Sequence, residues 1–502
     1  VDDDLLEWDK PIRDKLPEII FKDEYVNKHV TIRDMLCHRT GLPRHDLGVW
    51  RLDISRAEQI ERLRHYAFSA SFREKFQYNN HMYYAVAYIV ERLSGLRWED
   101  FIQQRIFDPL GMVASNFVPE PPQPGQVTSY GYRIERDEEG QPKGYVRMPY
   151  GKHTDVSPGA AGALFSTLDD LIEWLKVHVN GGQVGDKRII SQANLDQMHQ
   201  PQMIFPFAGP MEAIHEGTHL AAYGLGWFVQ PHRGYTIIHH GGNVEGFSLM
   251  TGFVPKQQIG IVVLTNSAAM PLRDVLLYEL ADRALDLPDG GWNAKYHSYF
   301  DPMFAGLSRG KQSSAAEQIA DAPPSHPLDA YVGTFAADGY PDFGVRQRED
   351  GSFEASTIGS LDWASLKHYH YDVFEWDLSD FDARMKVRFL TSDEGSIDSV
   401  SIPIEEAVDA VIFKRKPLEL PAELIAALVG DYDPGIPGMI FTVSSKAGKL
   451  YAAATGGTAA ELKPYRSDEK LVGLRGSFGR MEFVRQGAQI TRLILKIGRA
   501  HV

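Results

Sequence analysis

The spacing of hydrophobic residues divides the chain into regions of different character. In the first region apolar residues recur at helical spacing, most clearly over residues 82–93, and Thr31 stands where a helix N-cap is expected. Helical spacing returns at residues 271–287. Between these segments the pattern changes to short strand-like runs separated by turn residues, at 226–229, 235–239, 247–254 and 259–265. Residues 1–287 therefore predict an α+β fold, with helices packed on an antiparallel sheet.

The remainder of the chain predicts a linker and two small β domains. Residues 288–325 are rich in Gly, Ser, Pro and Ala, a composition typical of a linker. Strand-like segments follow, and three motifs recur in order at nearly constant offsets: Gly333 and Gly430 (430 − 333 = 97), Gly351 and Gly448 (448 − 351 = 97), and Arg384 and Arg480 (480 − 384 = 96). Such a long period indicates duplication of a domain, and we expect antiparallel β-barrels at 326–416 and 417–502.

Composition restricts the class of protein and its partners. With 502 residues, of which 43% are hydrophobic and 24% charged, the chain has the balance of a globular protein. A net charge of -15 disfavours nucleic acid and anionic membranes as partners. No apolar run approaches the roughly 20 residues that a membrane helix requires. Cys37 is the one cysteine, which rules out an internal disulfide and fits either a reducing compartment or a fold that needs no disulfide.

Two short motifs, Tyr78-Asn79-Asn80 and His240-Gly241-Gly242, contain residue types that serve acyl transfer. A serine hydroxyl becomes a good nucleophile when a base takes its proton, and Tyr78 is the candidate base. Bringing a tyrosine pKa from about 10 to neutrality requires about 4 kcal/mol, and a cation about 4 Å away supplies about that much at an effective dielectric of 20. Within this chain His240 is the candidate for this cation, although its reference pKa of about 6.5 leaves it charged only part of the time at neutral pH. A lysine three residues after the serine, on an upstream segment, would supply the steadier charge.

The residues beside these two rings suit substrate binding. Gly241 and Gly242 let a substrate backbone lie along the strand, and the amide of Asn243 can donate to a developing oxyanion. Asn80 offers both donor and acceptor groups with which to orient a substrate amide. The sequence therefore predicts a site formed by the loop before residues 82–93 and by the strand that contains His240.

These motifs occur together with others in a fixed order. The segments are 31–43 (Thr-Ile-Arg-Asp-Met-Leu-Cys-His-Arg-Thr-Gly-Leu-Pro), 76–80, 109–112 (Pro-Leu-Gly-Met), 223–227 (Tyr-Gly-Leu-Gly-Trp) and 240–242. In this combination the chain resembles the serine β-lactamase-like family of class C β-lactamases, penicillin-binding D-alanyl-D-alanine carboxypeptidases, D-aminopeptidases, esterases and acyltransferases. The resemblance implies that Tyr78 and Asn80 form the second family motif and His240 and Gly242 the third. It implies a serine acyl hydrolase or acyltransferase that acts on an amide, ester or lactam in a small-molecule or peptide substrate, without a cofactor or a metal.

The same resemblance implies a Ser-x-x-Lys nucleophile motif upstream of Tyr78, but none occurs there. The chain opens on Val1 rather than Met, so we expect that a preceding segment carries the nucleophile and that this chain alone is inactive. Two downstream matches, Ser308 with Lys311 and Ser467 with Lys470, lie in the predicted linker and second barrel and are interpreted as chance. The C-terminal domains resemble the lipocalin-like domains of the three-domain D-aminopeptidase-like architecture.

Two other functions remain open. The scaffold can bind a ligand without turnover, as a non-catalytic pseudoenzyme. The segment His215-Glu216-Gly217-Thr218-His219 matches the zinc-protease pattern, although its glycine weakens the helix that zinc chemistry requires. Of the remaining candidates, Cys37 is interpreted as a buried, inert thiol and His38 as a structural loop anchor. Alternation along the strand places His239 on the face opposite His240, so only the latter is assigned to the site.

Overall fold

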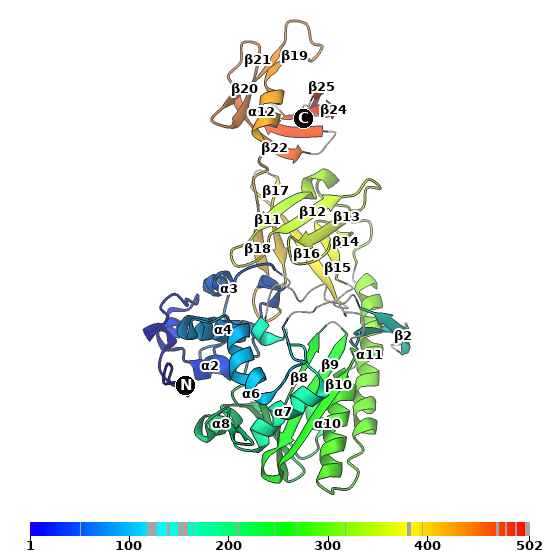
Figure 1. Cartoon of the computed structure of the whole chain (residues 1–502). Helices are drawn as coiled ribbons and strands as arrows, with labels where there is room; N and C mark the ends of the chain where they lie inside the picture. The colour runs from blue at the N-terminus through cyan, green and yellow to red at the C-terminus, as the bar shows by residue number, and fades with distance from the viewer. Residues whose placement is uncertain are drawn as a thin grey trace.

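The computed structural model describes residues 1–50, 52–117, 128–137, 141–148, 159–162, 164–207, 210–244, 246–268, 270–316, 318–378, 383–393, 395–467, 471–476, 479–486 and 489–496. An N-terminal domain of helices and a six-stranded sheet is followed by a closed β-barrel and then by a C-terminal sheet domain, stacked in that order (Figure 1). This arrangement confirms the α+β prediction and the two β domains. Within the described residues, each helix is too short or too polar to cross a membrane.

The helices of the N-terminal domain begin and end where local chemistry favours it. Thr31 caps α2 in a capping box with Asp34, and Gly95 adopts a left-handed φ of +73° directly after α4. Met82 and Ile89 of α4 lie in the hydrophobic core of this region. The helices are α1 (Glu24–His29), α2 (Ile32–Leu36), α3 (Arg56–Arg62), α4 (Asn80–Ser94), α5 (Trp98–Ile102), α6 (Asp108–Leu110), α7 (Leu168–Val179), α8 (Gln192–His199), α9 (Pro210–Ile214) and α10 (Met270–Ala284).

The central sheet is an antiparallel meander covered by helices on both faces. Its order is β10-β9-β8-β7-β6-β5, and neighbouring strands are consecutive in the chain, as predicted. Ile238 packs with Leu175 of α7, whereas the adjacent Ile237 packs with Leu277 of α10, because successive side chains point to opposite faces. The strands are β5 (Met203–Pro206), β6 (Leu220–Tyr223), β7 (Phe228–His232), β8 (Tyr235–Val244), β9 (Phe247–Val254) and β10 (Ile259–Thr265), with the small pairs β1 (Tyr132–Arg136) and β2 (Pro142–Arg147), and β3 (Gln183–Val184) and β4 (Lys187–Arg188).

The segment 288–325, expected to be a linker, contains a long helix, α11 (Trp292–Ala316). Trp292 and Tyr296, one turn apart, are buried in one cluster with Tyr278 of α10. Aromatic residues at helical spacing explain the first half of α11. The glycines and serines that suggested a linker fall in its second half.

The first barrel is a closed ring of eight antiparallel strands with a filled interior. Phe343, Phe374, Trp376 and Phe413 are fully buried in one cluster. Large aromatic side chains therefore form the core of this barrel. The strands are β11 (Gly333–Ala336), β12 (Phe343–Gln347), β13 (Phe353–Thr357), β14 (Ala364–His370), β15 (Val373–Leu378), β16 (Ala383–Thr391), β17 (Ile397–Ile402) and β18 (Val411–Arg415).

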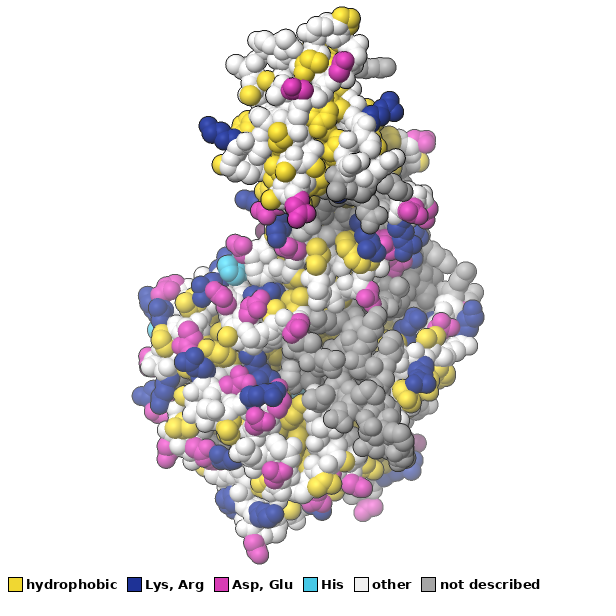
Figure 2. Space-filling view, turned by 45° about the horizontal axis from the view of Figure 1, so that its top comes forward, with side chains coloured by type: hydrophobic (Ala, Val, Ile, Leu, Met, Phe, Trp, Pro, Cys, Tyr) yellow, Lys and Arg dark blue, Asp and Glu magenta, His cyan; other side chains and the backbone are white. Residues whose placement is uncertain are grey.

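The C-terminal sheet domain repeats the first seven strands of this pattern. Gly333 and Gly430 begin β11 and β19 with φ of +150° and +159°, and Gly351 and Gly448 turn with φ of +85° and +77°. The described ladder runs from β19 to β25, and apolar side chains gather on the surface of this domain (Figure 2). Its elements are α12 (Ala422–Leu428), β19 (Gly430–Tyr432), β20 (Phe441–Lys446), β21 (Lys449–Ala454), β22 (Ala460–Ser467), β23 (Leu471–Gly476), β24 (Gly479–Gln486) and β25 (Gln489–Lys496).

Candidate active site

The fold brings Tyr78 and His240 together. Tyr78 lies on the loop that leads into α4, and His240 lies on β8. Their ring centroids are 6.1 Å apart, and both side chains are half-buried. The hydroxyl of Tyr78 has no hydrogen-bond partner within the described residues. The two predicted motifs thus face one another across a short gap.

His38 holds the backbone on both sides of Tyr78. Its carbonyl oxygen accepts a hydrogen bond from the amide of Gln77 at 2.8 Å, and its Nδ1 accepts one from the amide of Asn79 at 3.1 Å. The His38 and Tyr78 rings lie 4.2 Å apart. Burial lowers the pKa of His38 well below its usual value, which keeps Nδ1 free of a proton and able to accept. His38 is therefore an anchor for Tyr78.

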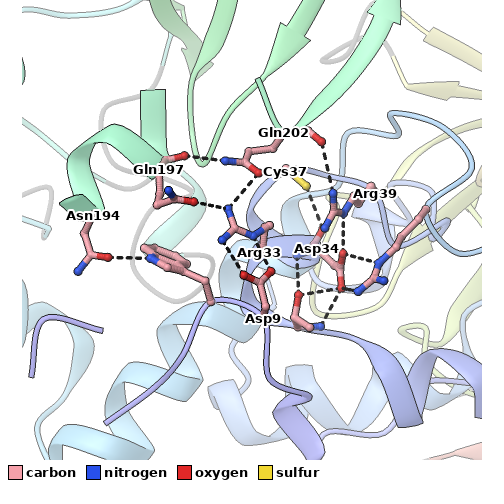
Figure 3. Close-up of polar contacts among 11 residues, drawn as sticks. Asp9, Arg33, Asp34, Cys37, Arg39, Asn194, Gln197 and Gln202 are labelled. Carbon is pink, nitrogen blue, oxygen red and sulfur yellow. Dashed lines mark hydrogen bonds and ion pairs between the residues drawn. The ribbon is translucent and has the colours of Figure 1, made fainter. Parts of the chain in front are cut away.

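A buried ion-pair network fixes the end of α2, next to His38 (Figure 3). Asp34 is fully buried and accepts hydrogen bonds from Thr31, Arg39 and Arg73. Burial opposes ionisation of Asp34, but the hydrogen bonds and charges of both arginines outweigh it, and the pKa of Asp34 stays below its usual value. The carboxylate therefore remains charged and holds the turn between α2 and His38 in place.

A second set of polar contacts borders Tyr78. The guanidinium carbon of Arg44 lies 5.2 Å from the centre of the Tyr78 ring. Arg44 Nε donates to Asp46 Oδ2 at 2.7 Å, and Asn80 Nδ2 donates to Asp46 Oδ1 at 3.1 Å. The amide nitrogen of Asn80, expected to orient substrate, is thus engaged by Asp46. Sequence reasoning missed Arg44 and Asp46, because no motif distinguishes them.

Burial sets the charge of both facing rings. It raises the pKa of Tyr78, and the charge of Arg44 offsets this only in part. Burial also lowers the pKa of His240 to about 4, so this imidazole is neutral at pH 7. Burial therefore opposes the part-time positive charge that was expected of His240 from the reference pKa of an imidazole in water. Arg44 is the cation over the Tyr78 ring in the described structure.

Beyond His240, strand β8 has one edge without a strand partner in the described structure, and Arg273 packs closely against Gly241. The ladder between β7 and β8 ends at the pair Phe228 and His239, so from His240 onward this edge of β8 has no strand partner in the described structure. A Cβ at Gly241 would lie 2.8 Å from the guanidinium carbon of Arg273, whereas Gly242 has open space around it. The glycines therefore permit close packing on one side and access on the other.

The end of β8 is held by side-chain hydrogen bonds. Arg273 Nη1 donates to the carbonyl oxygen of Gly242 at 2.9 Å. Ser248 donates its hydroxyl proton to Asn243 Oδ1. Gly242 and Asn243 are exposed, so the backbone of this segment faces solvent. The binding roles expected for both residues stay predictions.

The zinc-protease pattern does not lie on one helix. Helix α9 ends at Ile214, before both histidines. His215 is buried with its ring 4.5 Å from that of Tyr278, whereas His219 is exposed and contacts Glu212 at 3.3 Å. Across the described ranges, no group of three or more His, Cys, Asp or Glu residues is arranged to hold a metal.

Of the other reactive side chains, Cys37 packs in the same apolar cluster as Tyr78. Cys37 is fully buried, and burial raises the pKa of its thiol to about 12. Ser308 and Lys311 lie within α11, and Ser467 ends β22. Lys470 falls outside the described residues.

Comparison with known proteins gives matches over both halves of the chain. The model of the beta-lactamase family matches residues 1–285, and that of a domain of unknown function (DUF3471) matches residues 317–412. The chain is similar to the unguisins hydrolase ungD of Aspergillus violaceofuscus, with 26% identity over 368 residues, 67% of this chain and 62% of that protein. Penicillin-binding protein 4 of Amycolatopsis lactamdurans is 25% identical over 273 residues, 53% of this chain and 67% of that protein.

Among solved structures, the octameric penicillin-binding protein homologue from Pyrococcus abyssi has a TM-score of 0.47 and 21% identity, and the match covers 82% of this chain and 83% of that one. The present chain spans about three-fifths of the length of the unguisins hydrolases that it matches, 61% and 62%.

Proposed function

Because the chain belongs to the beta-lactamase family, a family of serine hydrolases, we propose that it takes part in serine acyl transfer, the attack of a serine hydroxyl on an amide, ester or lactam. Water or an amine then releases the acyl group. The observation that carries the proposal is the 6.1 Å approach of the Tyr78 and His240 rings, which come from separate motifs. The relatives named above, an unguisins hydrolase and a penicillin-binding protein, support hydrolysis and binding of a lactam.

In this mechanism Tyr78 transfers the proton. As the serine oxygen forms its bond to the carbonyl carbon, its proton passes to the phenolate of Tyr78, which then gives it to the leaving group. The raised pKa of Tyr78 means that Arg44 alone does not produce the phenolate, so a further cation is required. The lysine of a Ser-x-x-Lys motif supplies it, and we expect this motif outside residues 1–502.

His240 acts as a neutral hydrogen-bonding partner. Its Nδ1 lies 2.9 Å from the carbonyl oxygen of Gly241, and because a carbonyl can only accept, Nδ1 carries the proton. Nε2 therefore has a lone pair directed away from the backbone and can accept a hydrogen bond from Tyr78 or from substrate. The exposed backbone of Gly242 and Asn243 is proposed to bind the substrate acyl group along the open edge of β8.

Covalent labelling tests this function. Protein expressed from its natural gene, with any residues that precede Val1, is treated with fluorescent penicillin or a fluorophosphonate, and the modified peptide is identified by mass spectrometry. We expect one labelled serine, in a Ser-x-x-Lys motif outside residues 1–502, and no labelling of residues 1–502 alone. A label on Ser308 or Ser467 would contradict the mechanism.

The lack of Ser-x-x-Lys ahead of Tyr78 favours one second candidate, a pseudoenzyme that binds ligand without turnover. Saturable, reversible penicillin binding with no covalent adduct on the natural protein would support it and exclude the acyl-transfer proposal.

A further inference from the structure

His45 occupies a backbone conformation that its surroundings must enforce. Its φ of +45° is left-handed, which is unfavourable for a residue with a side chain. Such a residue persists where neighbouring groups determine its geometry. His45 lies between Arg44, which covers the Tyr78 ring, and Asp46, which accepts from Asn80. The conformation of His45 therefore decides where two residues of the candidate site lie.

The first barrel holds the imidazole of His45. Nε2 lies 2.8 Å from the carbonyl oxygen of Ala67, which can only accept, so Nε2 carries the proton. Burial lowers the pKa of His45, so the ring is neutral and Nδ1 is an acceptor. The hydroxyl of Tyr340 lies 2.6 Å from Nδ1 and donates to it. Tyr340 comes from the loop between β11 and β12 and packs against the barrel core and the N-terminal core together.

The barrel also holds the backbone of His45 and the ring stacked on it. The amide of His45 donates to Glu405 Oε2 at 3.1 Å, and Glu405 lies between β17 and β18. The ring of Tyr66 stacks on His45 at 4.8 Å, and its hydroxyl donates to the carbonyl oxygen of Gly339 at 2.9 Å. Tyr340 and Glu405 thus contact His45 directly, and Gly339 contacts it through Tyr66. In Figure 1 the first barrel stands on the N-terminal domain that contains His45.

We infer that the first barrel completes the candidate site, with Tyr340 and Glu405 as positioning residues that set the Arg44–Asp46 turn through His45. The inference rests on the proposed function. It gives the barrel a role in acyl transfer, since Arg44 is the cation beside Tyr78 and Asp46 holds Asn80. Neither Tyr340 nor Glu405 touches the reacting groups.

The test compares Tyr340→Phe and Glu405→Gln with Lys416→Gln, which removes an exposed ion pair to Asp342 in the same barrel. Three properties are measured on the protein expressed from its natural gene: hydrogen exchange of residues 44–50, the pKa of Tyr78 by NMR of its labelled ring carbon, and kcat and KM. For both positioning variants we expect faster exchange, a higher Tyr78 pKa because Arg44 moves away, and kcat about tenfold lower with KM within about twofold. Lys416→Gln keeps wild-type values.

The outcomes separate the inference from the function on which it rests. If Tyr340→Phe and Glu405→Gln both match Lys416→Gln in exchange and in the Tyr78 pKa, the inference is overturned, whatever the activity. If the wild-type protein shows no turnover, the proposed function fails, and exchange and the Tyr78 pKa still decide whether the barrel positions the turn. Glu405→Gln keeps the shape of the side chain. If one of the two variants, Tyr340→Phe or Glu405→Gln, fails to fold, the other still tests the inference.

Discussion

The two repeat domains differ in the loop that joins their first two strands. The first barrel has Gly339-Tyr340-Pro341 in this loop, and the C-terminal sheet domain has Gly435-Ile436-Pro437, an offset of 435 − 339 = 96. Tyr340 reaches into the N-terminal domain and donates to His45, whereas Ile436 is 45% exposed. One duplicated fold therefore carries two different loops. Residues in the loops between strands, Tyr340 and Glu405, therefore make the contacts by which the first barrel reaches the candidate site.

The largest effect is expected from the site that the first barrel supports. Tyr78→Phe and His240→Ala should each lower kcat/KM at least about a hundredfold, as loss of a proton-transfer partner typically does. Steady-state kinetics on the natural protein measure this, with the exposed Tyr25→Phe, 61% exposed, as the matched control. Near-normal rates for both variants would show that Tyr78 and His240 do not form the active site. The first barrel would then have no catalytic role that separates it from the second repeat.

Loss of a core aromatic residue should affect the two repeats unequally. Trp376 and Phe483 are both fully buried, and truncation of either to Ala should cost about 3–5 kcal/mol of domain stability. Calorimetry should detect both losses. We expect Trp376→Ala to lower kcat between about tenfold and a hundredfold, because the Tyr340 and Glu405 contacts are lost together, while Phe483→Ala retains turnover. Equal losses of turnover would contradict the special role of the first barrel.

Exchanging Tyr340 and Ile436 between the two repeats tests the difference between their loops at one position. Tyr340→Ile places the residue of the second repeat in the first, and it should lower kcat about tenfold by removing the donor to His45. The reciprocal change, Ile436→Tyr, should leave kcat unchanged. Steady-state kinetics of the two variants, measured side by side, test whether Tyr340 supports turnover. A wild-type kcat for Tyr340→Ile would contradict the difference drawn between the two loops.

At neutral pH the smallest effect comes from buried histidines, and it also separates the domains. The fully buried histidines of the described chain all lie in the N-terminal domain, and burial lowers the pKa of His81 to about 4 and that of His239 to about 3. Between about pH 6.5 and 4 the unfolded chain binds more protons than the folded one, so stability is full above this window and falls as the pH drops through it, by about 1.4 kcal/mol per pH unit for each such histidine.

Acid unfolding should therefore begin in the N-terminal domain. Hydrogen exchange at pH 7.5 and pH 5, resolved by domain, should show loss of protection there first, with little change in activity near pH 7. Simultaneous loss in both repeat domains would contradict this expectation.

Local patterns were sufficient to predict much of the fold. The capping box at Thr31, helix α4 and the meander β7–β10 follow from short-range periodicity and capping chemistry. The repeat was visible because glycines recur at the strand starts, Gly333 and Gly430, and in turns of positive φ, Gly351 and Gly448. The helix α11 was missed, because glycine and serine in its second half outweighed the aromatic spacing of its first.

The charges of the candidate site could not be predicted, because they depend on contacts distant in sequence. Motif order was enough to pair Tyr78 with His240. The neutral state of His240 depends on burial in the assembled domain, and the position of Arg44 depends on a turn held by Tyr340 from another domain. Reference pKa values and sequence spacing contain neither piece of information.

Phe343, Trp376 and Phe413 are fully buried in one packed cluster inside the first barrel. The residues that contact the N-terminal domain, Tyr340 and Glu405, lie in loops between strands at the rim of the barrel. Rim residues change without disturbing the wall, because loops tolerate substitutions that packed strands do not. Substitution of a few loop side chains can therefore adapt such a barrel to a different neighbouring domain. Tyr340 and Ile436 are two residues found at the same loop position of the two repeats.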